Sequence, residues 1–172
     1  MISAEYLSLQ KQLHATGKYG VSGHKYANLV HNIMRDYNTS DVLDYGCGQR
    51  SLERALGVVI RNYDPSIEGL DTRPEPADIV ACTDVLEHIE PAHLDAVLDD
   101  LQRLVKKAGL FVVFTQPAVK VLADGRNAHL IQEKMDWWMP KLKQRFYVVW
   151  HQEHEQQFAV IVGALKSNME MT

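Results

Sequence analysis

The stretch DVLDYGCGQRSL, residues 41–52, decides the fold of this chain. Residues 41–45 are a short, mostly apolar run, and they predict a buried β-strand. Residues 50–56 have the pattern of a short helix. Gly46 and Gly48 lie between the two, where they leave the backbone bare at the carboxyl end of the strand. Ligands commonly bind at this edge of an α/β sheet, so the stretch predicts a binding site as well as a fold.

Predicted helices and strands alternate along most of the chain. This order is typical of a mainly parallel sheet that is covered by helices on both faces. The closing segment has the pattern of a hairpin and adds an antiparallel strand. The expected helices span residues 4–15, 26–37, 50–56, 91–108 and 132–144, and the expected strands span residues 41–45, 58–64, 77–84 and 110–116, with the hairpin at 145–165. We expect Gly109 to end the fourth helix and Pro140 to bend or break the fifth.

Composition narrows the class of protein. The chain has 172 residues, 46% of them hydrophobic, which is enough for one globular domain. Its net charge of −4 predicts no general affinity for nucleic acids or anionic membranes. No apolar run approaches a membrane span of about 20 residues, and the first residues lack the pattern of a signal peptide. Cys47 and Cys82 show no disulfide or metal-binding spacing, so we expect free thiols in a cytoplasmic protein.

Two acidic residues indicate the kind of ligand. Asp44 lies close to Gly46, where its carboxylate would repel a phosphate and suit a cationic amino group. Asp64 ends the next predicted strand, where an acidic side chain accepts hydrogen bonds from the ribose hydroxyls of an adenosine. Ser51 stands where a dinucleotide-binding loop has its third glycine, which disfavours a nicotinamide-dependent oxidoreductase. A ligand with an adenosine at one end and an ammonium group at the other is S-adenosylmethionine.

Three motifs carry a resemblance to a known family. VLDYGCG at 42–48, YDPS at 63–66 and ADIVACTDVLEHI at 77–89 resemble the first, second and fourth motifs of class I S-adenosylmethionine-dependent methyltransferases. The chain as a whole, over residues 20–165, is similar to the small stand-alone methyltransferases often encoded by phages. The resemblance implies a Rossmann-like three-layer α/β sandwich and, for a phage-encoded enzyme, a place in the host cytoplasm.

The resemblance also implies how the chain is organised. We expect a single domain over residues 1–172, with a helical cap at 1–38 and the Rossmann-like core at 39–165. Tyr19 and Lys25 belong to the glycine-rich part of the cap, which in this fold can close over the cofactor. The alternative for Lys25 is a solvated position in the first turn of a helix.

The chain is shorter than the family's pattern after its second strand. Thirteen residues lie between Asp64 and Asp78, whereas a parallel crossover alone needs about a dozen and another strand would have to follow. We therefore expect the third strand, which forms an edge of the sheet, and its helix to be missing. The predicted sheet has the strand order 2-1-4-5-7-6 in the family's numbering, and Ile67 or Leu70 would cover the adenine.

The resemblance assigns roles to the residues that match the motifs. Asp44 would meet the methionine amino group directly or through water, and Asp64 would hold the ribose. Gly46 and Gly48 would pack under the cofactor. The full set expected to bind S-adenosylmethionine is Tyr19, Lys25, Asp44, Gly46, Cys47, Gly48, Asp64, Pro65, Thr83, Asp84 and Val85.

The acceptor side of the site depends on two histidines. His129 follows the strand whose carboxyl end should face the acceptor, and His88 lies in the fourth motif. Either is a candidate base, although many such enzymes need none, and the alternative for His129 is that it braces a loop. The D/N-P-P-Y/F motif of amino-methylating DNA enzymes is absent. We therefore expect a small-molecule or nucleotide acceptor, methylated at oxygen or nitrogen.

A metal site is a further possibility. Asp84, Glu87 and His88 form D-x-x-E-H, and with His129 they resemble the E-x-x-E-H plus histidine set that binds a divalent metal in RNA 3′-end methyltransferases and in a ubiquinone-pathway O-methyltransferase. Oxygen and imidazole ligands suit magnesium, manganese or zinc. The alternative is that Glu87 caps the helix that starts near Pro91.

Several alternatives stay open at this point. The chain could be a non-catalytic regulator or scaffold subunit that binds S-adenosylmethionine or S-adenosylhomocysteine, or it could methylate a nucleic-acid end with the help of a metal. His151 and His154 lie in a segment that we expect to be a solvated hairpin turn. Adjacent Trp137 and Trp138 cannot both face the core from one helix, so one of them should be partly exposed, in an acceptor pocket or against a partner.

Overall fold

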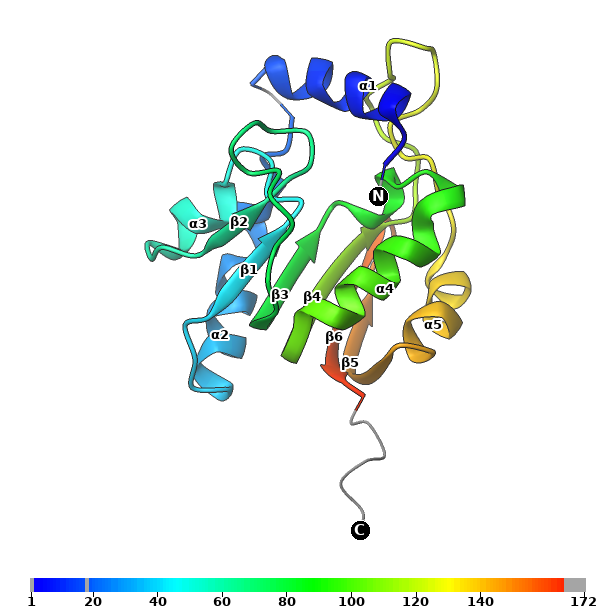
Figure 1. Cartoon of the computed structure of the whole chain (residues 1–172). Coiled ribbons are helices and arrows are strands. Elements are labelled where there is room, and N and C mark those ends of the chain that lie inside the picture. Colours follow the sequence, from blue (N-terminus) through cyan, green and yellow to red (C-terminus); the bar gives the residue numbers. More distant parts are fainter. Residues whose placement is uncertain (1, 18, 166–172) are drawn as a thin grey trace.

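Residues 2–17 and 19–165 are described by a computed structural model, which is shown in Figure 1. Its centre is a six-stranded sheet in the order β2-β1-β3-β4-β6-β5. The strands are β1 (Val42–Tyr45), β2 (Arg61–Tyr63), β3 (Ala77–Thr83), β4 (Val105–Phe114), β5 (Phe146–Glu153) and β6 (Gln157–Ala164). The domain expected over residues 1–172 includes Met1, Lys18 and residues 166–172, which lie outside the described residues.

Five strands of the sheet run in the same direction, and β6 runs against them. β1 pairs in parallel with β2 and with β3, and β3 pairs in parallel with β4. β6 is antiparallel to both β4 and β5. The mostly parallel, Rossmann-like sheet with an antiparallel last strand is therefore confirmed, together with its strand order.

The shortening after β2 is also confirmed. β2 forms one edge of the sheet, and residues 64–76 run on to β3 without a helix or strand. This loop is closed by a hydrogen bond of 2.9 Å from the Asp64 N–H to the Leu70 carbonyl. Only the edge of the sheet is lost, so the carboxyl ends of β1 and β3 remain side by side and can still form a site.

Helices cover both faces of the sheet, as Figure 1 shows. They are α1 (Ala4–Ala15), α2 (Ala27–Asp36), α3 (Ser51–Leu56), α4 (Leu94–Leu104) and α5 (Met135–Lys143), with short 3-10 turns η1 (Ser22–Tyr26), η2 (Leu86–His88) and η3 (Pro91–His93). Side chains of a strand alternate between the two faces, so in β3 Ile79 packs with α2 and α3 while Val80 packs with α4 and α5. Within the segment expected to form a cap, α1 lies across the carboxyl ends of the strands, whereas α2 belongs to a face of the sandwich.

One predicted boundary is wrong. The pattern predicts a helix over residues 91–108 that ends at Gly109, but α4 ends and β4 begins at Val105 without a loop between them. Val105 is buried and pairs with Ala77 of β3, and this pairing outweighs the helical pattern of the sequence. Gly109 lies inside the sheet, where a Cβ atom would come within 2.9 Å of a methyl group of Val162.

The two tryptophans of α5 have different environments. Trp138 is fully buried and its indole N–H donates to the Glu133 carbonyl at 3.1 Å, whereas Trp137 is 36% exposed. The expectation that only one of them faces the core is confirmed. Lys141 lies 4.0 Å from the centre of the Trp137 ring, and the helix continues through Pro140 instead of breaking there.

The hairpin of β5 and β6 contains the two histidines of the segment HQEHEQ, residues 151–156. His151 and His154 are exposed there, which confirms the solvated hairpin. In the described part of the chain, no helix has the length and apolar character that crossing a membrane requires.

Gly48, in the loop after β1, packs closely against Gly20, in the segment after α1. Its φ of +49° lies in the left-handed region, and a Cβ atom there would come within 2.5 Å of the Gly20 carbonyl oxygen. The same carbonyl accepts a hydrogen bond of 2.8 Å from the Gln49 N–H. Glycine is thus required at this position by contact with the chain itself, in addition to any ligand.

Gly48→Ala should destabilise the protein more than Gly57→Ala. Both glycines have positive φ, so alanine costs about 1–2 kcal/mol of backbone strain at either site. At Gly57 a Cβ atom would meet no described atom within 4 Å, whereas at Gly48 the clash with Gly20 should add about 1–3 kcal/mol. Urea unfolding measures both free energies, and equal losses would contradict the close packing of these two segments.

Candidate functional site

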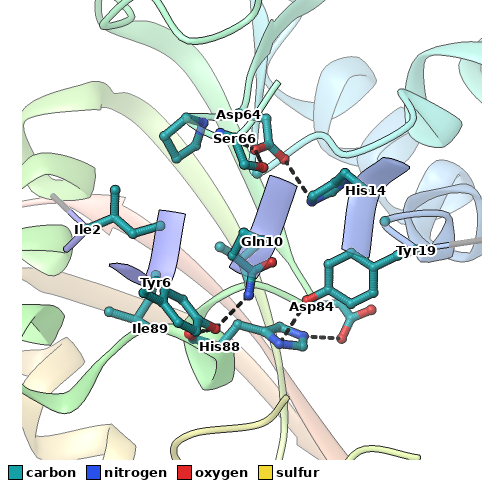
Figure 2. Close-up of a pocket in the computed structure, with 14 residues that line it drawn as sticks. Ile2, Tyr6, Gln10, His14, Tyr19, Asp64, Ser66, Asp84, His88 and Ile89 are labelled. Atoms are coloured by element: carbon teal, nitrogen blue, oxygen red, sulfur yellow. Dashed lines mark hydrogen bonds and ion pairs between the residues drawn. The ribbon is translucent and has the colours of Figure 1, made fainter. Parts of the chain in front are cut away.

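A cavity lies between α1 and the carboxyl ends of β1, β2 and β3 (Figure 2). One wall is the inner face of α1 with Ile2 ahead of it, and the other is formed by the segment that follows α1 and by the turns that follow the three strands. Its lining includes Ile2, Tyr6, Gln10 and His14 on the helix side, and Tyr19, Gly20, Gly46, Asp64, Pro65, Ser66, Asp84, Val85, His88 and Ile89 on the other. The cavity therefore brings residues of all three predicted motifs together with a helix that had no predicted role in the site.

The N-terminal half of α1 is held over this cavity by hydrogen bonds. The Ser3 N–H and hydroxyl donate to the Glu90 carboxylate at 2.9 and 2.8 Å, and the Ser3 oxygen in turn caps the helix. The Tyr6 hydroxyl donates to the His88 carbonyl, and Gln10 donates to Tyr6 at 2.7 Å. Residues four apart share one face of a helix. That spacing aims Tyr6, Gln10 and His14 into the cavity, as Figure 2 shows.

Asp44 is the most unusual acidic residue of the site. It is 3% exposed at the end of β1, and no group among residues 2–17 and 19–165 donates a hydrogen bond to its carboxylate. Burial, together with the nearby carboxylates of Asp64 and Glu53, raises the pKa of Asp44 to about 7. Asp44 is not itself a lining residue of the cavity, but Gly46, two residues later, is. A buried carboxylate without a donor is stabilised when a cation approaches it.

Asp64, by contrast, has several partners in the protein. One oxygen accepts from the N–H and hydroxyl of Ser66 at 2.9 and 2.5 Å, and the other accepts from the Gly48 N–H at 3.1 Å. His14 Nε2 lies 3.8 Å from the second oxygen. Burial lowers the pKa of His14, although Asp64 acts in the opposite direction. Asp64 therefore faces the cavity with its loop already ordered, and a ribose there would meet His14.

Asp84 has a backbone conformation that few residues adopt. Its φ is +62°, a region in which aspartate is better tolerated than most residues. One oxygen accepts from the Ser22 hydroxyl at 2.6 Å, and the other lies 3.5 Å from His88 Nε2 and 3.9 Å from His129 Nε2. Burial opposes the ionisation of Asp84, but its contacts with His88 and Ser22 outweigh this effect and lower its pKa to about 2.

The two histidines present the same edge to Asp84. His88 Nδ1 donates to the Ala128 carbonyl at 2.7 Å, and His129 Nδ1 donates to the Gln116 carbonyl at 2.6 Å. In both rings the Nε2 atom faces the Asp84 carboxylate. Burial lowers the pKa of His129, whereas contacts with Asp84 and Glu87 raise the pKa of His88 against the effect of burial. His129 thus braces its loop, as one interpretation of the sequence has it, and also faces the site.

Glu87 does not cap the helix near Pro91. It is fully buried, and its Oε1 atom accepts a hydrogen bond of 2.8 Å from the Phe114 N–H at the end of β4. Its Oε2 atom is buried without a hydrogen-bond partner in the described structure. Burial raises the pKa of Glu87 to about 8. Glu87 and the two histidines are, with Asp84, the side chains that could hold a metal, because one ligand atom from each lies within 4.8 Å of the others.

The remaining predicted residues differ in their distance from the cavity. Pro65 and Val85 line it, and so does Tyr19, whose hydroxyl lies 3.1 Å from His88 Nδ1. Cys47 and Thr83 are buried and are not lining residues, and burial raises the pKa of the Cys47 thiol. Lys25 is exposed in η1 and lies outside the cavity lining, so the structure favours the solvated alternative for this residue.

Two further hollows adjoin the cavity. One shares His14 and Ser66 with it and is lined by Gly48, Ile67 and Leu70, which places the two apolar side chains expected to cover the adenine beyond Asp64. The other shares Tyr19, Asp84 and His88 with it and extends to Ser22, Gln116 and His129. An elongated ligand that passes Asp64 and Asp44 would thus have room for its base at one end and a reaction partner at the other.

Sequence reasoning missed the contribution of α1. Tyr6, Gln10 and His14 are spaced by four residues and carry polar atoms on one side of the helix, which is a signal for a functional face. Ser22 and Ser66 were also missed, because hydroxyl groups in turns are common and only their contacts with Asp84 and Asp64 single them out.

A cationic ligand should bind more tightly as the pH rises from 6 to 8. Because the pKa of Asp44 is raised to about 7, a proton competes with the cation below that pH and no longer competes above it. For a ligand that needs the ionised carboxylate, apparent affinity should rise about tenfold over this interval. Titration calorimetry with S-adenosylhomocysteine measures the effect. In Asp44→Asn the rise should disappear, and an unchanged pH profile in this variant would contradict the role of Asp44.

Comparisons with known proteins agree with this geometry. The sequence profile of a family described as "Methyltransferase domain" matches residues 18–159. No protein with curated annotation matches the chain.

Solved structures with the same fold include three methyltransferases or related complexes. The 1,6-didemethyltoxoflavin-N1-methyltransferase of Burkholderia thailandensis, with 1,6-didemethyltoxoflavin and S-adenosylhomocysteine bound, is 14% identical over 96% of this chain and 92% of that chain, with a TM-score of 0.67. The DhpI complex with S-adenosylhomocysteine is 17% identical over 95% and 100% of the two chains, with a TM-score of 0.64. The magnesium protoporphyrin IX methyltransferase of Synechocystis PCC 6803, with S-adenosylhomocysteine bound, is 16% identical over 83% of each chain, with a TM-score of 0.59.

Proposed function

Because this chain belongs to the methyltransferase-domain family, we propose that it transfers a methyl group from S-adenosylmethionine to an oxygen or nitrogen atom of a small-molecule or nucleotide acceptor. Three structures of the same fold contain S-adenosylhomocysteine, the product of such a transfer. Membership in the family supports the class of reaction, and the geometry of the site supports the placement of the donor and the acceptor.

The observation that carries the proposal is the buried carboxylate of Asp44. It lies at the end of β1, lacks a hydrogen-bond donor in the described structure and is close to a second carboxylate, Asp64. An ammonium group would offset the charge of Asp44, and a ribose diol would supply hydroxyl donors for Asp64. S-adenosylmethionine has both groups at the ends of one molecule. The residues present therefore fit this donor.

Each part of the chain has a distinct task in this arrangement. The donor supplies an electrophilic methyl group when bound. Asp44 would orient its amino group, Asp64 its ribose, and Ile67 with Leu70 its base. α1 would exclude water from the cavity, since Tyr6 and Gln10 close it from above the strands. Where the ribose meets Asp64, it would replace the contact of that carboxylate with His14.

The acceptor is best accommodated in the hollow that Asp84, His88 and His129 share. In-line transfer requires the acceptor lone pair to be aligned with the methyl group, and the walls of this hollow would provide that alignment. The Nε2 atom of His129 could accept the proton of an acceptor hydroxyl or amine, because its Nδ1 donates to the Gln116 carbonyl and burial lowers its pKa. His88, whose pKa is raised beside Asp84, would hold that carboxylate in place.

We also place the protein in the cytoplasm, which would be the host cytoplasm if a phage encodes it. The support is chemical: Cys47 and Cys82 are both free and buried, as expected for thiols in a reducing compartment. Neither contributes to the lining of the cavity.

Asp64→Asn should weaken binding of S-adenosylhomocysteine about ten- to a hundredfold, because it removes the charge from a carboxylate that would accept two ribose hydrogen bonds. Asp71→Asn is a matched control in the same loop, since Asp71 is exposed. Calorimetric titration of the full chain measures both affinities, and circular dichroism checks that the variants fold. Equal affinity for the wild type and Asp64→Asn would contradict the placement of the ribose.

Turnover separates the enzyme from a binding protein. Transfer of a labelled methyl group to hydroxyl- or amine-bearing small molecules or nucleotides would support the proposal. Tight binding of the donor without transfer to any member of a broad acceptor panel would favour a regulator or scaffold subunit. Failure to bind either S-adenosylmethionine or S-adenosylhomocysteine would overturn the proposed function.

A further inference from the structure

Four side chains with metal-binding atoms converge where the donor cavity meets the acceptor hollow. They are Asp84, Glu87, His88 and His129, and one ligand atom from each lies within 4.8 Å of the other three. In the described residues, no other group of histidine, cysteine and acidic side chains is arranged in this way. Two carboxylates and two imidazoles form a ligand set suited to manganese or zinc.

The two imidazoles are already oriented as ligands. His88 and His129 each donate Nδ1–H to a backbone carbonyl, that of Ala128 and of Gln116 respectively, so the Nε2 lone pair of each ring can point at a common centre. Second hydrogen bonds of this kind fix ring orientation in metal sites. Asp84 Oδ1 lies 3.5 and 3.9 Å from the two Nε2 atoms. These separations suit ligands about 2.1 Å from a shared ion, which can be at most about 4.2 Å apart.

Glu87 supplies an independent observation. Its side chain is fully buried, and while Oε1 accepts from the Phe114 N–H, Oε2 has no hydrogen-bond partner in the described structure. A buried carboxylate oxygen without a partner is costly. A cation bound among these four side chains would give this oxygen a partner. The two ligand atoms that lie farthest apart would only have to approach each other by a few tenths of an ångström.

We propose that Asp84, Glu87, His88 and His129 bind one divalent cation, manganese or zinc, whose open coordination positions face the acceptor hollow. The proposal deepens the proposed function and rests on it for the identity of the hollow. An acceptor hydroxyl on the cation would release its proton to solvent water more readily, and the resulting oxygen would bond to the methyl carbon as the bond from that carbon to the donor sulfur breaks. A second nearby oxygen on the same molecule would add affinity and orientation. The acceptor class is therefore a molecule with two adjacent oxygen donors, such as a vicinal diol or a catechol.

This assignment changes the task of the two histidines. As ligands through Nε2 they would hold the cation and would not take the acceptor proton. Without a cation, the same geometry is an ion pair between His88 and Asp84 with His129 beside it. The two descriptions differ in whether the purified protein binds a metal ion with defined stoichiometry.

Titration of the full chain with Mn²⁺, followed by calorimetry and by electron paramagnetic resonance of the free ion, tests the site directly. Wild-type protein should bind one equivalent. His129→Gln and the isosteric Glu87→Gln should each weaken binding at least about tenfold, and His93→Gln should stay within about twofold of the wild type. His93 is a matched control because its Nε2 lies 3.9 Å from a Glu90 oxygen on the surface, outside the cluster. Zn²⁺ is titrated in parallel.

The outcomes separate this proposal from the proposed function. S-adenosylhomocysteine is titrated in the same samples, and His129 is outside the lining of the donor cavity, so its replacement should leave donor binding unchanged. Donor binding without binding of Mn²⁺ or Zn²⁺ would overturn the metal site alone. Metal binding without donor binding would overturn the proposed function and leave the metal site in place. Metal binding that survives both cluster variants would show that the ion binds elsewhere and would also overturn the assignment.

Discussion

The burial of carboxylates at one edge of a parallel sheet is the constraint on which the rest of this structure depends. Parallel strands end at the same edge, so β1, β2 and β3 bring Asp44, Asp64 and Asp84 close together. Hydroxyl, amide and imidazole groups of the chain compensate two of these charges. Asp44 has no such compensation in the described structure, and Glu87 nearby has it at only one oxygen. The edge is therefore electrostatically incomplete, and it favours ligands that bring positive charge.

α1 shields the uncompensated carboxylates from bulk water, which strengthens their attraction for a cationic ligand. A carboxylate in contact with bulk water would gain little from a cationic ligand, because water screens the attraction. The helix crosses the edge, where Ser3 at one end donates to Glu90 and His14 at the other end lies 3.8 Å from Asp64. Electrostatic contacts beneath it are correspondingly stronger. The contact of His14 with Asp64 also couples the position of the helix to the place proposed for the ribose.

The sequence was sufficient to predict what local patterns determine. The glycine-rich turn follows from a run of a few residues, whereas the strand order follows from the resemblance to the methyltransferase family. The missing edge strand follows from the thirteen-residue spacing after Asp64, compared with the pattern of that family. The boundary at Val105 was not predictable in this way, because pairing with a distant strand outweighs the local helical pattern. The role of α1 depends on contacts such as Ser3 with Glu90, 87 residues apart, and no local pattern encodes them. The hydrogen bond from His129 to the Gln116 carbonyl, which orients the His129 ring, was not predictable for the same reason.

A crystal structure with S-adenosylhomocysteine bound would test the central claim most directly. The amino group of the ligand should lie within about 3 Å of the Asp44 carboxylate or share one water with it. The ribose hydroxyls should donate to Asp64, and His14 should have moved away from that carboxylate. A ligand bound elsewhere, or one whose amino group is held by other residues while Asp44 keeps no donor, would contradict the account.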